Sequence, residues 1–168
     1  MTETSPPARI LQVQWEDPAQ LPAAGRTLSG LAFLEAIRDG KLPPPPIGML
    51  IDMSLDRVEK GTVGFSIRLG EQHHNPMATI HGGIPATMLD SAMGCAVHSM
   101  LEQGSGYATL ELKVNIVRPM TAATGTVFAT GSVIHLGRTT ATAEGRLVDA
   151  AGKLYAHATT TCMIFGAK

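Results

Sequence analysis

A long, almost wholly apolar segment occupies the middle of the chain, from Gly83 to Leu101. Within residues 84–97 its only polar side chains are Thr87, Asp90 and Ser91. The segment predicts one helix of about 28 Å, at about 1.5 Å per residue. A helix that is apolar on nearly every side is buried, so the rest of the chain must wrap around it.

The segments on both sides of this helix alternate between apolar and polar residues, which is typical of half-buried β-strands. Two runs precede the helix, Met49–Leu55 and Val63–Leu69, and four follow it, Leu110–Ile116, Thr126–Leu136, Thr139–Val148 and Lys153–Phe165. This order predicts an α+β fold, in which an antiparallel sheet packs against one long helix.

The N-terminal segment has a different character. Residues 1–26 show no hydrophobic period, which predicts an irregular arm with Trp15 as its one anchor. Ser29 as an N-cap and Gly40 near the C-terminus predict a short helix between them. Pro43–Pro46 then predict a stiff, extended connector. The short helix is either a lid over one end of the core or a plain surface helix.

Length and charge narrow the class of protein. The 168 residues fit one domain, which we place at 47–168 with 1–46 as its arm. Thirteen basic and 14 acidic residues, without long like-charge runs, argue against a nucleic-acid or membrane partner.

No secretory signal is recognisable, so we expect a cytoplasmic protein. Cys95 and Cys162 lie in apolar stretches without CxxC spacing, which predicts core thiols.

Two features bring polar chemistry into this apolar background. A carboxylate in a buried helix, such as Asp90, costs desolvation energy unless it is paired, hydrogen-bonded or protonated. The residues alone leave a structural and a functional Asp90 equally open. At the start of the helix, His81-Gly82-Gly83 offers free N–H groups to an oxyanion. Loop geometry is the alternative reason for these glycines.

The segment that contains both features, NPMATIHGGIPATMLDSAMG, resembles the signature of the hotdog-fold acyl-CoA thioesterases of the phenylacetate-degradation (PaaI-like) type. The resemblance covers about residues 47–165 and implies a sheet wrapped around one central helix. It implies that Asp90 is the general base or nucleophile and that the Gly82 N–H polarises the thioester carbonyl. It also implies that Asn75 and His81 assist substrate placement and that Thr109 orients the carboxylate or water.

Further candidates belong to substrate binding. The helix residues Gly83, Met88 and Met93 flank the expected site, although the methionines are also ordinary core filling. Arg138 lies at a hairpin tip, where it either contacts a CoA phosphate or is a solvated turn residue. The spacing of His73, His74 and His81 fits no common set of metal ligands. We therefore expect no metal and no cofactor, because CoA is part of the substrate.

The spacing of Gly82 and Asp90 has a consequence for assembly. Eight helical residues separate their backbones by about 12 Å, whereas both must lie about 3 Å from one reacting group. An antiparallel arrangement across a two-fold axis brings Asp90 of one protomer to Gly82 and Asn75 of the other. We therefore expect a homodimer, and the resemblance implies a possible dimer of dimers.

The expected function is hydrolysis of a medium-chain or aromatic acyl-CoA to CoA and free acid. One alternative is a hotdog-fold hydratase or dehydratase, which needs an Asp and a His in one loop, yet no Asp lies between Asp56 and Asp90. The other is a non-catalytic acyl-CoA-binding protein. Such a protein needs an output domain, and the 46-residue arm is too short and too weakly basic for a DNA-binding helix-turn-helix.

Overall fold

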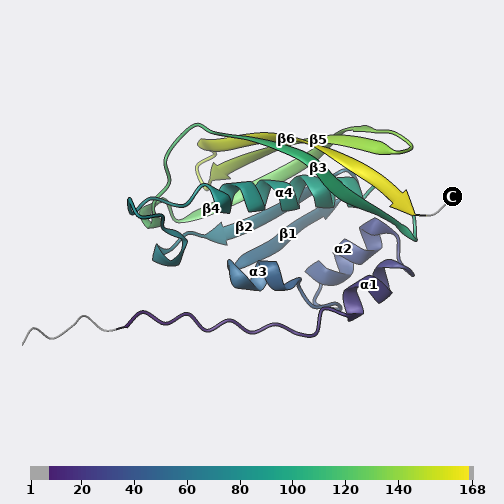
Figure 1. Cartoon of the computed structure of the whole chain (residues 1–168), viewed down its shortest axis with the longest axis horizontal. Coiled ribbons are helices and arrows are strands. Elements are labelled where there is room, and N and C mark those ends of the chain that lie inside the picture. The colour runs from purple at the N-terminus through teal and green to yellow at the C-terminus, as the bar shows by residue number, and fades with distance from the viewer. Residues whose placement is uncertain (1–7, 167–168) are drawn as a thin grey trace, which may run out of the picture.

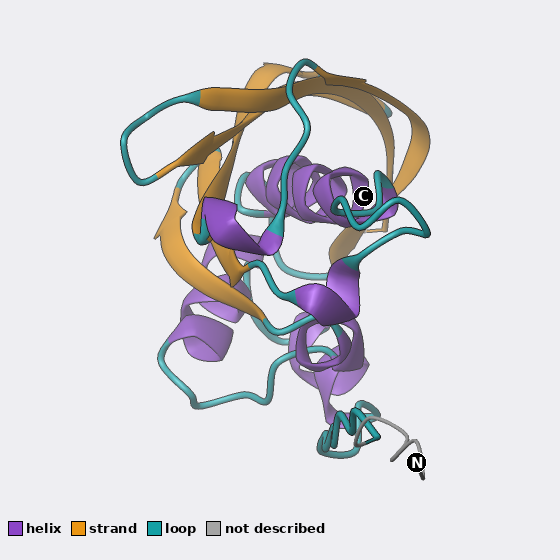
Figure 2. Cartoon of the chain, turned by 90° about the vertical axis from the view of Figure 1, so that its left-hand side faces the viewer, coloured by secondary structure: helices purple, strands orange, loops and turns teal. Residues whose placement is uncertain are grey.

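Six antiparallel strands curve around one long helix in the computed structural model, which describes residues 8–166 (Figures 1 and 2). The helices are α1 (Gln20–Gly25), α2 (Gly30–Arg38), α3 (Pro46–Leu50) and α4 (Gly83–His98), with two short 3₁₀ turns at Glu71–His73 and Ala122–Thr124. The strands are β1 (Met53–Glu59), β2 (Thr62–Arg68), β3 (Ser105–Ile116), β4 (Thr126–Leu136), β5 (Thr140–Asp149) and β6 (Leu154–Gly166). The predicted α+β hotdog fold is confirmed.

The strands lie in the order β1-β2-β4-β5-β6-β3, and every neighbouring pair is antiparallel. Consecutive strands pair except at β3, which follows α4 directly but crosses to the far edge and pairs with β6. The edge strand β3 therefore runs beside α4, and its outer edge has no partner strand within the described chain.

Helix α4 packs closely on the concave face of the sheet. Met88, Leu89, Ala92 and Met93 have no exposed surface and form the centre of the core. The opposite side of α4, which carries Thr87, Asp90 and Ser91, is only partly buried. The prediction that the chain encloses α4 therefore holds for the sheet-facing side, whereas the side next to β3 stays open.

The N-terminal half departs from the predictions in four places. Part of the expected irregular arm forms α1, and the expected extended connector ends one residue early because Pro46 begins α3. Proline is favoured in the first helical turn, where its missing N–H is not needed. The strand expected from Met49 consequently begins at Met53. Trp15 is 58% exposed and lines a surface pocket with Pro44 and Met49, so the expected anchor makes only a surface contact. The first seven residues of the arm lie outside the described part.

Helix α2 confirms the predicted capping pattern and is fixed to the end of α4. The Ala32 N–H donates to the Ser29 Oγ at 3.3 Å, and Gly40 adopts a φ of 70° just after the helix. The Gly30 N–H donates to the Leu101 carbonyl oxygen at 3.0 Å. As a result α1 and α2 lie together below the C-terminal end of α4 (Figure 1). Over residues 8–166, none of the helices has the length and apolarity needed to cross a membrane.

Candidate active site

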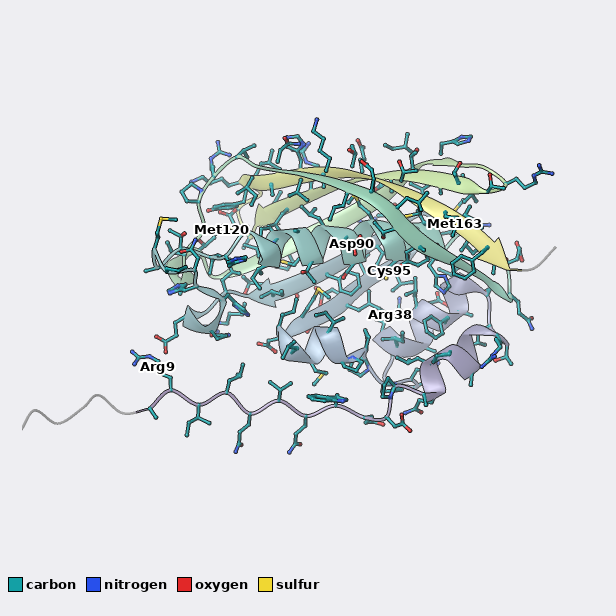
Figure 3. The ribbon with its side chains drawn as sticks, viewed as in Figure 1. Arg9, Arg38, Asp90, Cys95, Met120 and Met163 are labelled. Carbon is teal, nitrogen blue, oxygen red and sulfur yellow. The ribbon has the colours of Figure 1, made fainter. Side chains whose placement is uncertain are left out.

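Asp90 lies midway along α4, on the side that faces β3 (Figure 3). Its carboxylate is partly exposed, and its Oδ1 accepts a hydrogen bond from the Thr109 hydroxyl at 3.0 Å. Exposure lowers the desolvation cost of this charged side chain. The predicted partnership of Asp90 and Thr109 is present in the structure, and one face of the carboxylate remains open to solvent.

The N-terminus of α4 presents a free backbone donor at Gly82. This exposed residue is the N-cap, with φ −59° and ψ −19°, and its carbonyl oxygen accepts from the Ala86 N–H at 3.3 Å. Within residues 8–166 its own N–H donates to no other residue. A free N–H at the positive end of a helix suits a developing negative charge on oxygen.

His81 has a defined orientation at the same helix end. Its Nδ1 accepts a hydrogen bond from the Gly83 N–H at 2.9 Å. An accepting Nδ1 places the proton of the neutral imidazole on Nε2. The exposed ring can therefore donate from Nε2, whereas the Gly83 N–H is occupied and gives no support to the predicted substrate contact of Gly83.

Asn75 uses its side chain to shape the loop that leads to His81. Its Oδ1 accepts from the N–H groups of Met77 and Thr79 at 2.9 and 3.2 Å, and its Nδ2 donates to the Thr79 Oγ1 at 2.9 Å. One of the two Nδ2 hydrogens remains available. The structure thus brings Asn75 and His81 into one loop, with Asn75 as its internal brace.

One protomer does not bring the two halves of the predicted site together. Gly82 and Asp90 lie on the same helix, about 12 Å apart along its axis. The neighbours of Gly82 include Ile116 of β3, whose Cδ1 lies 3.3 Å from the position of an added Cβ. The protomer therefore contains two separate half-sites, a donor end and a carboxylate centre.

The remaining predicted substrate contacts are Met88 and Met93, which are buried, and Arg138, which is exposed. Met88 and Met93 are fully buried beneath the sheet, so neither offers surface to a substrate in this protomer. Their alternative role as core filling is what the structure shows, because an apolar helix face on a sheet needs such deformable side chains. Arg138 is exposed at the turn between β4 and β5, where its contact with substrate stays a prediction.

Tyr107 lies near Asp90 but was not among the predicted site residues. The Tyr107 ring packs on Gly94, where an added Cβ would lie 2.6 Å from ring atoms. Burial, helped by Cys95 and Asp90, raises the pKa of Tyr107 well above its usual value. Burial also raises the pKa of the Cys95 thiol to about 12. The usable signal was position: Gly94 follows Asp90 by one helical turn, and Tyr107 precedes Thr109 by two strand residues.

The chain resembles known esterases and thioesterases in sequence and in fold. The family model of the thioesterase superfamily matches residues 77–156, which include the α4 motif and most of the sheet. A protein of Halobacterium salinarum named as an esterase is 34% identical over 106 residues, covering 60% of this chain and 68% of its own. The 1,4-dihydroxy-2-naphthoyl-CoA hydrolase of Listeria monocytogenes is 28% identical over 104 residues, covering 62% and 83%.

Solved structures extend the likeness to the fold. A phenylacetic acid degradation-related protein of Ralstonia eutropha superposes with a TM-score of 0.70 and 27% identity, covering 77% of this chain and 98% of its own. The expected PaaI-like resemblance and the expected class of enzyme, a thioester hydrolase, are thereby confirmed at the level of the family. The chain belongs to the thioesterase superfamily.

Proposed function

We propose that this chain is an acyl-CoA thioesterase that hydrolyses a medium-chain or aromatic acyl-CoA to CoA and the free acid. The observation that carries the proposal is the partly exposed Asp90 carboxylate held by the Thr109 hydroxyl, on the same helix as the free Gly82 N–H. Hydrolysis of a thioester needs an activated water or carboxylate and a donor aimed at the developing oxyanion.

In the proposed reaction, Asp90 takes a proton from water as the oxygen attacks the thioester carbonyl, or attacks that carbonyl itself. The Gly82 N–H stabilises the resulting oxyanion, and His81 and Asn75 position the substrate. When water attacks, the carbon–sulfur bond then breaks, the CoA sulfur takes the proton from Asp90 and the acid leaves. When Asp90 attacks, breakage of this bond leaves an acyl anhydride on Asp90; water hydrolyses the anhydride to release the acid, and the CoA sulfur takes up a proton from that water. Water and the ester are the only reactants, so we propose no cofactor and no metal. Arg138 is proposed to contact a CoA phosphate.

We further propose that the site is composite and forms in a homodimer. Edge strand β3 supports this, because Leu110 and Ile116 are 59% and 47% exposed on a long strand without an outer neighbour. Such an edge is a template for pairing with a second chain. A two-fold axis beside Ala86 would bring Gly82 of one helix level with Asp90 of the other, since each lies four residues from Ala86.

Release of free thiol from a panel of acyl-CoAs tests the activity. We expect Asp90→Asn and Asp90→Ala to lower turnover at least about tenfold, because both remove the proton acceptor. Asp56→Asn, an exposed carboxylate on β1, is the matched control and should retain parental turnover. Parental turnover in both Asp90 variants would refute its assignment. Tight binding of acyl-CoA without any hydrolysis by the parent would favour the non-catalytic alternative.

Mixing two inactive variants tests the composite site. Gly82→Pro removes the proposed donor at a φ of −59° that proline adopts, and Gly82→Ala keeps the donor as its control. In a mixed dimer of Asp90→Ala and Gly82→Pro protomers, one of the two sites is intact. Random exchange should therefore restore about a quarter of parental activity. A mixture no more active than its parts, or a fully active monomer in light scattering, would contradict the composite site.

A further inference from the structure

A cavity of about 500 Å³ lies between the N-terminal helices and the C-terminal half of α4. This volume falls within the range of small-molecule sites, about 300–1,000 Å³. Its lining is mostly apolar and includes Gly25 on α1, Phe33 and Ile37 on α2, Cys95 and His98 on α4, and Tyr107 on β3. Neither Gly82 nor Asp90 lines this cavity, so it is separate from the two half-sites.

The cavity nevertheless lies close to the carboxylate along both α4 and β3. Along α4, Cys95 follows Asp90 by five residues, about 7.5 Å, and both are on partly exposed positions of the helix (Figure 3). Along β3, Thr109 bonds Asp90 while Tyr107, two residues earlier and on the same face of the strand, lines the cavity. The cavity therefore begins about 7 Å beyond the carboxylate, toward the end of α4.

The inner wall of the cavity carries no charge at neutral pH. Burial lowers the pKa of His98, and burial raises the pKa of Cys95 and Tyr107, so all three side chains are neutral. Arg26 is the one charged residue of the lining, and it is exposed. A neutral, apolar interior accepts hydrocarbon and disfavours a phosphate or a carboxylate.

The outer wall of the cavity is held in a fixed position. The Gly30 N–H bonds the Leu101 carbonyl oxygen, and the Phe33 ring meets the His98 ring edge-on at 5.5 Å between centroids. Leu34 of the same helix is only 3% exposed. Helices α1 and α2 lie outside residues 77–156, which the family model matches.

We propose that this cavity holds the distal part of the substrate's acyl chain, and that α1 and α2 set the greatest length that fits. The inference rests on the proposed function, because it places the thioester carbonyl at Asp90. An extended chain with bonds of about 1.5 Å advances about 1.25 Å per carbon, so roughly six carbons bridge the 7 Å to the cavity. Straight chains of roughly eight to twelve carbons therefore reach it, whereas a butanoyl group does not. The preferred substrate class is thus a medium-length alkanoyl-CoA rather than an ester of a single aromatic ring.

Filling the cavity from either helix tests the inference. At Gly25 the nearest atom to an added Cβ is the Phe33 Cε2 at 4.0 Å, so Gly25→Leu extends into open space. Ile37→Phe enlarges a lining side chain on the second helix. Ala23→Leu makes a similar addition at an exposed position of α1 that does not line the cavity, and it is the matched control.

The readout is kcat/KM for straight-chain CoA esters from butanoyl to dodecanoyl. In the parent, kcat/KM should rise about fourfold for each methylene that enters the cavity, from about 0.8 kcal/mol per buried methylene. Both filling variants should lose at least about tenfold on dodecanoyl-CoA and change less than about twofold on butanoyl-CoA. The Ala23→Leu variant should keep the parental profile.

The possible results separate the two proposals. If the parent hydrolyses these esters and both filling variants keep its chain-length profile, the cavity assignment is wrong and the thioesterase function stands. If the parent hydrolyses no ester, the proposed function fails, and calorimetric binding of dodecanoate then decides the cavity alone. Weaker binding by both filling variants than by Ala23→Leu would support the assignment, and equal binding would overturn it.

Discussion

Gly131 and Gly145 pair with each other across β4 and β5, and both lie against α4. A Cβ added at Gly131 would lie 2.4 Å from the carbonyl carbon and oxygen of Ala92 and 2.5 Å from the Met93 nitrogen. A Cβ added at Gly145 would meet only side-chain atoms of Leu89 and Met93, at 3.0 to 3.2 Å. The same substitution thus meets helix backbone at one position and flexible side chains at its neighbour.

The magnitude follows from these contacts. Restoring an ordinary carbon contact of about 3.5 Å at Gly131 requires helix and sheet to separate by about 1 Å, which forfeits up to about half of the attraction in neighbouring contacts. Overpacking of this kind costs about 1–3 kcal/mol and occasionally more, and a backbone neighbour belongs at the upper end. We therefore expect Gly131→Ala to lower the free energy of unfolding by about 3 kcal/mol. At Gly145 the neighbouring side chains can move. Alanine also stabilises the protein by about 0.4–1 kcal/mol, because it restricts the unfolded chain. The net loss in the free energy of unfolding should therefore be below about 1 kcal/mol.

Thermal unfolding at one fixed protein concentration measures the difference. For a chain of this size, about 1 kcal/mol corresponds to about 2–4 °C in Tm. Gly131→Ala should therefore lower Tm by about 6–12 °C and Gly145→Ala by less than about 4 °C. Thiol release should fall more in Gly131→Ala, because Ala92 lies two residues from Asp90. Equal losses in the two variants would refute the close helix–sheet contact as the cause.

Three further outcomes are expected. Thr109→Val, which removes the donor to Asp90, should lower kcat about tenfold, since hydrogen bonds to charged groups contribute about 1.5–3 kcal/mol; Thr109→Ser should retain most activity. Because burial raises the pKa of Cys95 to about 12 and also raises the pKa of Cys162, neither thiol should react rapidly with a disulfide reagent at pH 8. Both should react after unfolding in urea, and a fast native thiol would contradict the burial. Burial lowers the pKa of His98, so as the pH falls below about 6.5 the unfolded chain takes up the proton first and stability decreases, levelling off below the folded-state pKa. The drop in Tm between pH 7.5 and pH 5.5 should be smaller in His98→Phe than in the parent.

Patterns that depend on local spacing predicted the architecture. The apolar segment predicts α4, and the alternating runs predict strands close to β2, β4, β5 and β6. The order of strands was not predictable in the same way. Pairing of β3 with β6 joins Thr109 to Cys162, 53 residues later in the sequence, and no local period encodes that choice.

The start of β3 shows why an element boundary can be missed. Gly104, Ser105 and Gly106 are typical of a loop, yet β3 begins at Ser105 because β6 pairs with it from there. At Gly106 an added Cβ would lie 2.6 Å from the Phe165 ring, so the glycine makes room for a side chain of the neighbouring strand. The predicted strand began at Leu110, so Tyr107 lay outside it and its position beside Asp90 was not predicted.

The candidate site was predictable where residue type and spacing carry the chemistry, and less so where hydrogen bonds assign each atom. The motif indicated Asp90 and the helix end at Gly82, and the structure shows the Thr109 hydroxyl bonded to Asp90, while the catalytic roles of these residues stay predictions. It did not indicate that the Gly83 N–H bonds His81 or that Asn75 braces its own loop. These bonds depend on the fold of the loop, which the spacing of residues does not define.

Apolar residues also lie on the side of α4 that the sheet leaves open. A helix covered by the sheet of one chain needs apolar residues on one side only. The side of α4 next to β3 is not covered in this protomer, yet it carries Ile84 and Ala86 beside Asp90. Exposed leucine and isoleucine on β3 continue this surface. Because a solvated helix face would be mostly polar, we infer that a second chain covers α4 here, and the feature that predicted the fold therefore also supports a site shared between two protomers.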